Sequence, residues 1–132
     1  MSSKRIIVVV DDEPFIRQVI TKKLLGAGYD VHVARDGLEG IELVQRLKPN
    51  LVVTDYQMPK ATGMDLCNAC REDSATRETP IILLTGSITA AEPVLQTQVE
   101  ALGNIVYMSK PFSPRELLKK VGELAEDSAE NQ

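Results

Sequence analysis

Five polar residues in this sequence have side chains that could do chemistry together, and each ends or follows an apolar segment. They are Asp11 and Asp12 after "RIIVVV", Asp55 after "LVVT", Thr85 after "IILL" and Lys110 after "IVYMS". Carboxylates are hard oxygen ligands that suit Mg²⁺, and an aspartate can also act as a nucleophile that forms an acyl phosphate. A lysine adds a positive charge and a threonine adds a hydroxyl donor. The set therefore matches the requirements of phosphoryl transfer.

These side chains could meet only if the apolar segments are parallel strands of one sheet. Strands are expected at residues 5–10, 30–34, 51–54, 81–84 and 105–108. Several are nearly all apolar, as parallel strands covered on both faces are. Amphipathic segments separate them, which predicts five βα units and a parallel sheet with helices on both faces. Such sheets bind ligands beyond the carboxyl ends of their strands, where the polar residues fall.

Two of the predicted helices have readable patterns. In "SPRE", Ser113 is expected as N-cap, Pro114 as the first helical residue and Glu116 as the residue that reaches back to the cap. The first helix is expected to start ahead of Pro14, with Glu13 at its beginning. Its apolar side is predicted to contain Phe15, Ile16, Val19, Ile20 and Leu24.

The composition is typical of one globular domain. The chain has 132 residues, of which 43% are hydrophobic and 26% charged, and this length allows one buried core. No apolar run approaches the roughly 20 residues that span a membrane. The start "MSSKR" lacks the features of a signal peptide, so a cytoplasmic location without membrane contact is expected. The formal net charge of -4 leads us to expect no direct nucleic-acid binding.

The cysteines and the single histidine allow two interpretations. Cys67 and Cys70 form a C-x-x-C pair, which is typical of a redox site or of half a zinc site. No second Cys/His pair completes a tetrahedral zinc site, and His32 is remote in the sequence. We therefore interpret the cysteines as small buried helix residues. His32 lies in the alternating run "DVHVAR", which favours a solvent-facing position on a strand.

Each polar residue at a strand end also has an ordinary structural explanation. Asp12 or Glu13 could cap the following helix, Thr85 is a good strand former, and Lys110 could be a solvated loop residue. Their joint placement at four of the five predicted strand ends instead favours a common site. Two carboxylates about 4 Å apart repel by roughly 4 kcal/mol at an effective dielectric of about 20, and a divalent cation such as Mg²⁺ removes this repulsion.

Four motifs follow one another along the chain: "VVVDDEP", "VVTDYQMPKATGMD", "ILLTG" and "YMSKPF". In this order they resemble the signatures of the response-regulator receiver domain of two-component signalling, and the similarity covers nearly the whole chain. The resemblance implies a flavodoxin-like, doubly wound α/β fold in which a five-stranded parallel sheet has the order 2-1-3-4-5. It also implies a phosphorylation switch similar to chemotaxis regulators, which catalyses only its own phosphorylation and dephosphorylation.

The roles of the site residues follow from the resemblance by position. Asp55 would accept a phosphoryl group from the phosphohistidine of a sensor histidine kinase or a histidine phosphotransfer protein. Asp12, Asp55 and the main-chain carbonyl of Gln57 would bind Mg²⁺ directly, while Asp11 would act through a bound water. Lys110 would pair with Asp55 and later with the phosphoryl oxygens.

The switch implied by the resemblance uses Thr85 and Tyr107. Thr85 would reach a phosphoryl oxygen, and Tyr107 would turn into the space that this movement vacates. The ordinary interpretation of Tyr107 is a strand aromatic at the edge of the core. The Lys110–Pro111 peptide bond is expected to be cis. The change would be relayed to the surface formed by the fourth helix, fifth strand and fifth helix, where it would control a partner protein or an output domain.

Two other functions stay open at this point. A phosphohydrolase of the haloacid-dehalogenase kind also uses an aspartate nucleophile, magnesium and a lysine. It normally has a second aspartate where this chain has Gln57, and its acid pair comes late in the chain. A structural adaptor that keeps the fold without phosphotransfer would not need the full acid, threonine and lysine set. The sequence does not separate a stand-alone receiver from a piece of a longer protein.

The predicted boundaries are a disordered tail at 1–4, a receiver domain at 5–125 and a short acidic tail at 126–132. Between Thr85 and Gly103 the chain is a few residues longer than is usual in receiver domains, which predicts a longer loop beside the site. The helix in this segment starts either at a capping box "TAAE" or with Glu92 as N-cap and Pro93 as first residue. We favour the second start, because a proline at the fourth helical position would forfeit a backbone hydrogen bond.

Overall fold

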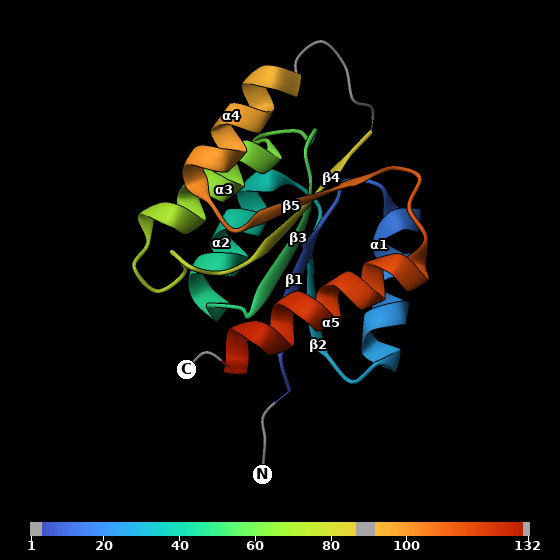
Figure 1. Ribbon diagram of the computed structural model, residues 1–132. Helices are drawn as coiled ribbons and strands as arrows, with labels where there is room; N and C mark the ends of the chain where they lie inside the picture. The colour runs from blue at the N-terminus through green and yellow to red at the C-terminus, as the bar shows by residue number, and fades with distance from the viewer. Residues whose placement is uncertain (1–3, 87–91, 131–132) are drawn as a thin grey trace.

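Five strands and five helices alternate within residues 4–86 and 92–130, which the computed structural model describes (Figure 1). The strands are β1 Ile6–Val10, β2 Asp30–Ala34, β3 Leu51–Asp55, β4 Ile81–Thr85 and β5 Ile105–Ser109. The helices are α1 Pro14–Gly26, α2 Gly37–Leu47, α3 Gly63–Glu72, α4 Glu92–Leu102 and α5 Pro114–Glu130. In this described part of the chain, no helix combines the length and apolar character needed to cross a membrane.

The strands form one parallel sheet in the order β2-β1-β3-β4-β5. This confirms the predicted flavodoxin-like, doubly wound fold. The chain moves from β1 to one edge of the sheet and then returns to the other side of β1 to form β3. The carboxyl ends of β1 and β3 therefore flank the position where the winding reverses, which is where open α/β sheets bind ligands.

The sheet separates two apolar cores, because successive side chains of a strand point to opposite faces. Val8 and Val10 of β1 pack on the face covered by α2, α3 and α4, whereas Ile7 and Val9 pack on the face covered by α1 and α5. Figure 1 shows the same division of the helices. All four side chains are fully buried, which explains why β1 is an unbroken apolar run.

Three strands extend one residue further than predicted. β3, β4 and β5 end at Asp55, Thr85 and Ser109, while β1 begins one residue later than predicted. The ladder continues beyond the apolar run, since the N–H of Tyr56 donates to the carbonyl of Leu84 at 2.9 Å. The polar residues at these ends therefore belong to the strands, whose hydrogen bonds hold their backbone in place.

The apolar side of α1 differs from the prediction at one residue. The helix begins with Pro14, as predicted, and buries Ile20 and Leu24, but Phe15 is 72% exposed. Ile16, Ile20 and Leu24 follow one another at intervals of four and form the buried stripe. Phe15 precedes Ile20 by five positions, which rotates it about 140° away from that stripe.

Two other helix boundaries also differ from the prediction. α4 begins at Glu92, one residue before the favoured start, and Pro93 is tolerated in the first turn, where no helical hydrogen bond is lost. The alternative capping box lies outside the described residues, as do positions 1–3 and 131–132 of the predicted tails. α5 starts as predicted, with Ser113 Oγ accepting from the N–H of Glu116 at 3.4 Å. It continues to Glu130, past residue 126, at which the acidic tail is predicted to start.

Arg71, near the end of α3, forms hydrogen bonds with the turn between α4 and β5. Its Nη2 donates to the carbonyl of Gly103 at 2.9 Å, and its Nη1 donates to the carbonyl of Thr76 at 3.3 Å. The N–H of Gly103 donates to the carbonyl of Val99 at 2.9 Å, and the Val99 side chain is buried in the core on that face. The C-terminal end of α4 is thus held both by α3 and by the core.

The cysteines are buried helix residues, as interpreted from the sequence. Cys67 and Cys70 are unpaired thiols of α3 with exposures of 0% and 1%. Burial raises the pKa of Cys67 to about 12 and that of Cys70 to about 11, so both thiols stay protonated and poorly reactive. His32 lies on the edge strand β2 with its side chain 38% exposed, and its Nε2 is 3.2 Å from Oδ1 of Asp30.

Candidate functional site

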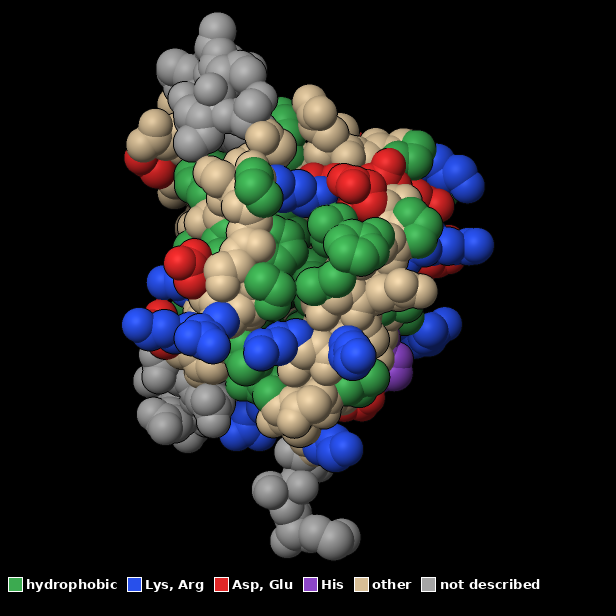
Figure 2. Space-filling model, turned by 90° about the vertical axis from the view of Figure 1, so that its right-hand side faces the viewer, with side chains coloured by type: hydrophobic (Ala, Val, Ile, Leu, Met, Phe, Trp, Pro, Cys, Tyr) green, Lys and Arg blue, Asp and Glu red, His purple; other side chains and the backbone are tan. Residues whose placement is uncertain are grey.

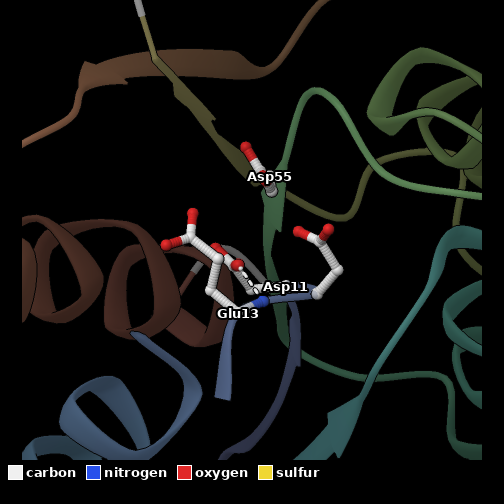
Figure 3. A group of neighbouring side chains, drawn as sticks. Asp11, Glu13 and Asp55 are labelled. Atoms are coloured by element: carbon white, nitrogen blue, oxygen red, sulfur yellow. Dashed lines mark hydrogen bonds between the residues drawn. The ribbon is translucent and has the colours of Figure 1, made fainter. Parts of the chain in front are cut away.

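Four carboxylates meet at the carboxyl edge of the sheet. One oxygen from each of Asp11, Asp12, Glu13 and Asp55 lies within 4.8 Å of the others. In Figure 3 the labelled side chains of Asp11 and Glu13, from the segment after β1, approach that of Asp55 at the end of β3. Figure 2 shows acidic side chains gathered next to a basic one near one end of the molecule, with hydrophobic side chains below them. The structure thus brings together the three predicted acids and adds a fourth.

Asp11 is fully buried, and both of its carboxylate oxygens have partners. Oδ1 accepts from the N–H of Glu13 at 2.9 Å, and Oδ2 accepts from Lys110 Nζ at 3.0 Å. The first bond closes a turn in which an aspartate binds the N–H two residues further on. Arg17 Nη1 also donates to the carbonyl of Asp11 at 2.8 Å. Asp11 is therefore held in place, whereas Asp12 is exposed and more accessible to a ligand.

Lys110 lies at the centre of the acids. Its Nζ is 3.0 Å from Asp11 Oδ2, 3.2 Å from Glu13 Oε1 and 3.4 Å from Asp55 Oδ2. The predicted pairing with Asp55 is present, but the shortest contact is with Asp11. The Lys110 side chain is only 14% exposed. A largely buried ammonium surrounded by carboxylates offsets part of their mutual repulsion.

The pKa of Asp55 is raised from 3.8 to about 6. Burial is the largest cause, because it disfavours the charged form, and the nearby Asp11 carboxylate adds repulsion. Lys110 opposes both effects without cancelling them. Ionised Asp55 is therefore held at a free-energy cost that a further positive charge would reduce.

The pKa of Lys110 is raised above its usual value. Burial alone would lower this pKa, but the hydrogen bond and the charge of Asp11, together with the charge of Asp55, outweigh burial. The ammonium consequently stays charged throughout the neutral pH range. It supplies a permanent positive centre next to the Asp55 carboxylate.

The remaining predicted residues surround this cluster less closely. Thr85 is 6% exposed at the end of β4, and its carbonyl accepts from the N–H of Lys110 at 2.7 Å. The Lys110–Pro111 peptide bond is cis, as the resemblance implied. Gln57 is exposed two residues after β3. Tyr107 of β5 is 38% exposed, so in this structure it is not a buried core aromatic.

Two residues of the site were not recognised in the sequence. Glu13 was interpreted only as the start of α1, yet it caps no helical N–H with its side chain and contacts Lys110 instead. Arg17 was given no role, and it binds the Asp11 carbonyl. The tendency of aspartate to bind the N–H two residues on is a signal that could have placed Asp11 and Glu13 in one turn.

A glycine keeps the backbone behind Asp55 closely packed. A Cβ added to Gly63, the first residue of α3, would lie 2.5 Å from the carbonyl oxygen of Asp55 and 2.9 Å from Leu83 Cδ1. The N–H of Gly63 also donates to the carbonyl of Tyr56 at 2.8 Å. The start of α3 therefore lies directly against the end of β3 and supports the position of Asp55.

Comparisons with known proteins agree with this architecture. The family model described as "Response regulator receiver domain" matches residues 7–122. The DNA-binding response regulator MtrA of Mycolicibacterium smegmatis is 36% identical over 115 residues, covering 87% of this chain and 48% of that protein. The probable transcriptional regulator ycf27 of Porphyridium aerugineum is 41% identical over 118 residues, covering 89% of this chain and 47% of that protein.

Solved structures show the same similarity. The chemotaxis protein CheY4 of Vibrio cholerae superposes with a TM-score of 0.83 at 32% sequence identity. The aligned region covers 92% of this chain and 99% of the CheY4 chain. The chain belongs to the response regulator receiver domain family. Its class is thus signalling rather than metabolic catalysis, which disfavours the phosphohydrolase alternative.

One expectation from the sequence is wrong. The net charge of -4 led us to expect no direct nucleic-acid binding, but the matched relatives include a protein named as a DNA-binding response regulator. The chain spans about half the length of the curated relatives it matches. The charge of this half therefore carries no information about what the rest of such proteins binds.

The acidic cluster fits the metal that receiver domains use. Receiver domains generally bind Mg²⁺ at an acidic pocket, and this chain presents carboxylate oxygens, which are the hard ligands that Mg²⁺ prefers. Asp12 is exposed, so its carboxylate oxygens are open to a cation. A cation beside Asp55 would favour the ionised form of that carboxyl, whose pKa is raised to about 6 by burial and by the Asp11 carboxylate. The donor set therefore supports the predicted cofactor.

Proposed function

We propose that this chain is a phosphorylation-dependent signalling switch in which Asp55 accepts a phosphoryl group from a sensor histidine kinase or a histidine phosphotransfer protein. The observation that carries this proposal is the buried Asp55 carboxylate, 3.4 Å from Lys110 at the carboxyl edge of the sheet. Membership of the receiver family supports it. The switch would act in the cytoplasm, and residues 5–125 would form the receiver domain.

The chemistry assigned to Asp55 is an in-line displacement. A carboxylate oxygen of Asp55 would attack the phosphorus of the donor phosphohistidine, the P–N bond would break, and an acyl phosphate would form. Asp12, Asp55 and the Gln57 main-chain carbonyl would hold Mg²⁺, with Asp11 acting through a water. The bound cation would supply positive charge that offsets the charge of the phosphoryl oxygens. Lys110 would provide a second positive centre on the same oxygens.

The response to phosphorylation would start at Thr85. Its hydroxyl would donate to a phosphoryl oxygen, and Tyr107 would turn inward from its present exposed position. Thr85 and Ser109 are paired in the register of β4 and β5, so a displacement at Thr85 has a direct route to the strand that contains Tyr107. The affected surface would be the one formed by α4, β5 and α5.

The output of the switch would be gene regulation. The matched relatives are named as a DNA-binding response regulator and a probable transcriptional regulator, and this chain corresponds to about half of each. We infer that phosphorylation of Asp55 controls a DNA-binding output segment or partner. The receiver would then act through contact with that output.

A mass measurement tests the phosphoacceptor assignment. The purified chain is incubated with acetyl phosphate in the presence and absence of Mg²⁺, and the intact mass is recorded. We expect one added phosphoryl group, which requires Mg²⁺ and is absent from Asp55→Asn. The matched control is Asp30→Asn, because Asp30 is a partly exposed aspartate of β2 that lies outside the site. An unmodified wild-type mass would support the adaptor alternative, and sustained turnover of a phosphomonoester would support the phosphohydrolase.

A further inference from the structure

The ammonium of Lys110 contacts three carboxylates and donates hydrogen bonds to two of them. Nζ donates to Asp11 Oδ2 at 3.0 Å and to Glu13 Oε1 at 3.2 Å, and Asp55 Oδ2 lies 3.4 Å away. An ammonium group has no fourth donor. A phosphoryl oxygen that binds Lys110 would therefore compete with these carboxylates for its three donors.

The three carboxylates differ in how firmly they are held. Asp11 is fully buried, and its second oxygen accepts the N–H of Glu13. Asp55 is 6% exposed and is the residue that would receive the phosphoryl group. The Glu13 side chain is 58% exposed. Of the three contacts, the one with Glu13 is the easiest to break, because water can solvate the released carboxylate.

The backbone around Glu13 does not require its side chain. Glu13 is the N-cap residue of α1, with an extended backbone, and its carboxylate accepts no hydrogen bond from the first helical turn. The turn that leads into the helix is instead closed by Asp11 Oδ1. Figure 3 shows this bond and the Glu13 carboxylate beside Asp55. Release of Glu13 from Lys110 would leave the turn and the helix unchanged.

We propose that Glu13 occupies one donor of Lys110 in the unphosphorylated protein and is the group that a phosphoryl oxygen on Asp55 displaces. Glu13 is then a positioning residue that competes with the phosphoryl group for Lys110 and so favours the unphosphorylated state. This inference rests on the proposed function of Asp55. A protein with a neutral residue at position 13 would lack this competition for Lys110.

The test measures binding of fluoroberyllate, a tetrahedral phosphoryl mimic that adds no transferable group. Fluoroberyllate is titrated into the full chain, and amide NMR signals report its dissociation constant. Each variant is studied at Mg²⁺ concentrations shown to be saturating by a separate Mg²⁺ titration, because Glu13 also belongs to the acidic cluster. A change in Mg²⁺ affinity therefore does not enter the comparison.

Two substitutions separate contact with Lys110 from general charge. Glu13→Gln removes the negative charge. Glu13→Asp keeps the charge, but the shorter side chain prefers to cap the first turn of α1 instead of reaching Lys110. The matched control is Glu42→Gln, since Glu42 is an exposed acid of α2 and the substitution changes the net charge equally.

We expect Glu13→Gln and Glu13→Asp to bind fluoroberyllate about twofold to fivefold more tightly than the wild type and Glu42→Gln, which is the range set by an exposed ion pair. Equal affinities for the wild type and Glu13→Gln would overturn the inference. So would a wild-type affinity for Glu13→Asp alongside tighter binding by Glu13→Gln, because general charge would then explain the effect. If wild-type protein binds no fluoroberyllate, or Asp55→Asn binds it equally, the proposed function itself fails and this inference fails with it.

Discussion

Replacing Asp55 should stabilise the metal-free protein, although it removes the proposed phosphoacceptor. The pKa of Asp55 is raised from 3.8 to about 6, first by burial and then by the Asp11 carboxylate. Each pKa unit of difference between the folded and unfolded states corresponds to about 1.4 kcal/mol. Ionised Asp55 therefore costs the folded state up to about 3 kcal/mol. Asn has nearly the same shape without the charge. Solvent at the open side of the site screens part of the cost, so we expect Asp55→Asn to raise the free energy of unfolding by roughly 1 to 2 kcal/mol at about pH 8.

The sign of this effect depends on pH. Between about pH 4 and pH 6 the folded wild-type protein retains a proton that the unfolded chain has released. Wild-type stability should therefore fall as the pH rises through this interval, while Asp55→Asn should lack this contribution. Urea unfolding in the presence of a chelator, followed by far-UV circular dichroism, measures both curves. Circular dichroism is preferred because the chain has no tryptophan.

The control and the refuting result follow from the same linkage. Asp30→Asn removes a partly exposed aspartate outside the cluster, and its stability relative to wild type should not follow the pH dependence expected for Asp55→Asn. The reasoning would be refuted if the stability difference between Asp55→Asn and wild type were the same at about pH 4 and pH 8. It would also be refuted if Asp55→Asn were the less stable protein at the higher pH.

Two further predictions concern packing. Gly63→Ala should destabilise the protein by about 1 to 3 kcal/mol, because its Cβ would lie 2.5 Å from the Asp55 carbonyl oxygen. At Gly26 an added Cβ would meet no atom within 4 Å, so Gly26→Ala should be neutral or stabilise α1 by up to roughly 1 kcal/mol. Similar urea midpoints for the two variants would contradict this account. Cys67 and Cys70 should not react with a thiol reagent in the native protein, because they are buried and their pKa values are raised to about 12 and about 11. Rapid labelling of the native protein would contradict this prediction and show that α3 opens readily.

The convergence of Asp11, Asp55 and Lys110 could be predicted from the sequence because the topology does most of the positioning. In a parallel sheet every strand ends at the same edge, so residues that follow buried runs meet there even when they are far apart in the chain. The apolar runs of β1, β3 and β4 are short and bounded by polar residues, and they are buried except at Ile6. Such segments leave little doubt about where each strand ends.

The role of Glu13 could not be read in the same way. Its place before Pro14 is explained completely by the start of a helix, which is a local signal. Its actual partner, Lys110, lies 97 residues further along the chain. Whether the carboxylate turns toward the helix or toward Lys110 depends on the turn closed by Asp11, and only the three-dimensional structure contains that information.

Exposure and charge were the less predictable properties. Phe15 and Tyr107 are hydrophobic residues within regular elements, yet they are 72% and 38% exposed. A strand or helix pattern shows which face is apolar but not how far a neighbouring element covers it. The net charge misled in a different way, because it describes only the half of the relatives' length that this chain matches.

The hydrogen bonds of Arg71 hold the C-terminal end of α4 at Gly103, so a tilt of the helix would pivot about that end. The helix has 11 residues, so at about 1.5 Å per residue it is roughly 16 Å long. A tilt of about 10° around the end held by Arg71 would move the opposite end by roughly 3 Å. That opposite end is the one that follows Thr85 in the chain. Such a tilt would therefore displace the end of α4 that follows β4, while the end next to β5 stays where it is.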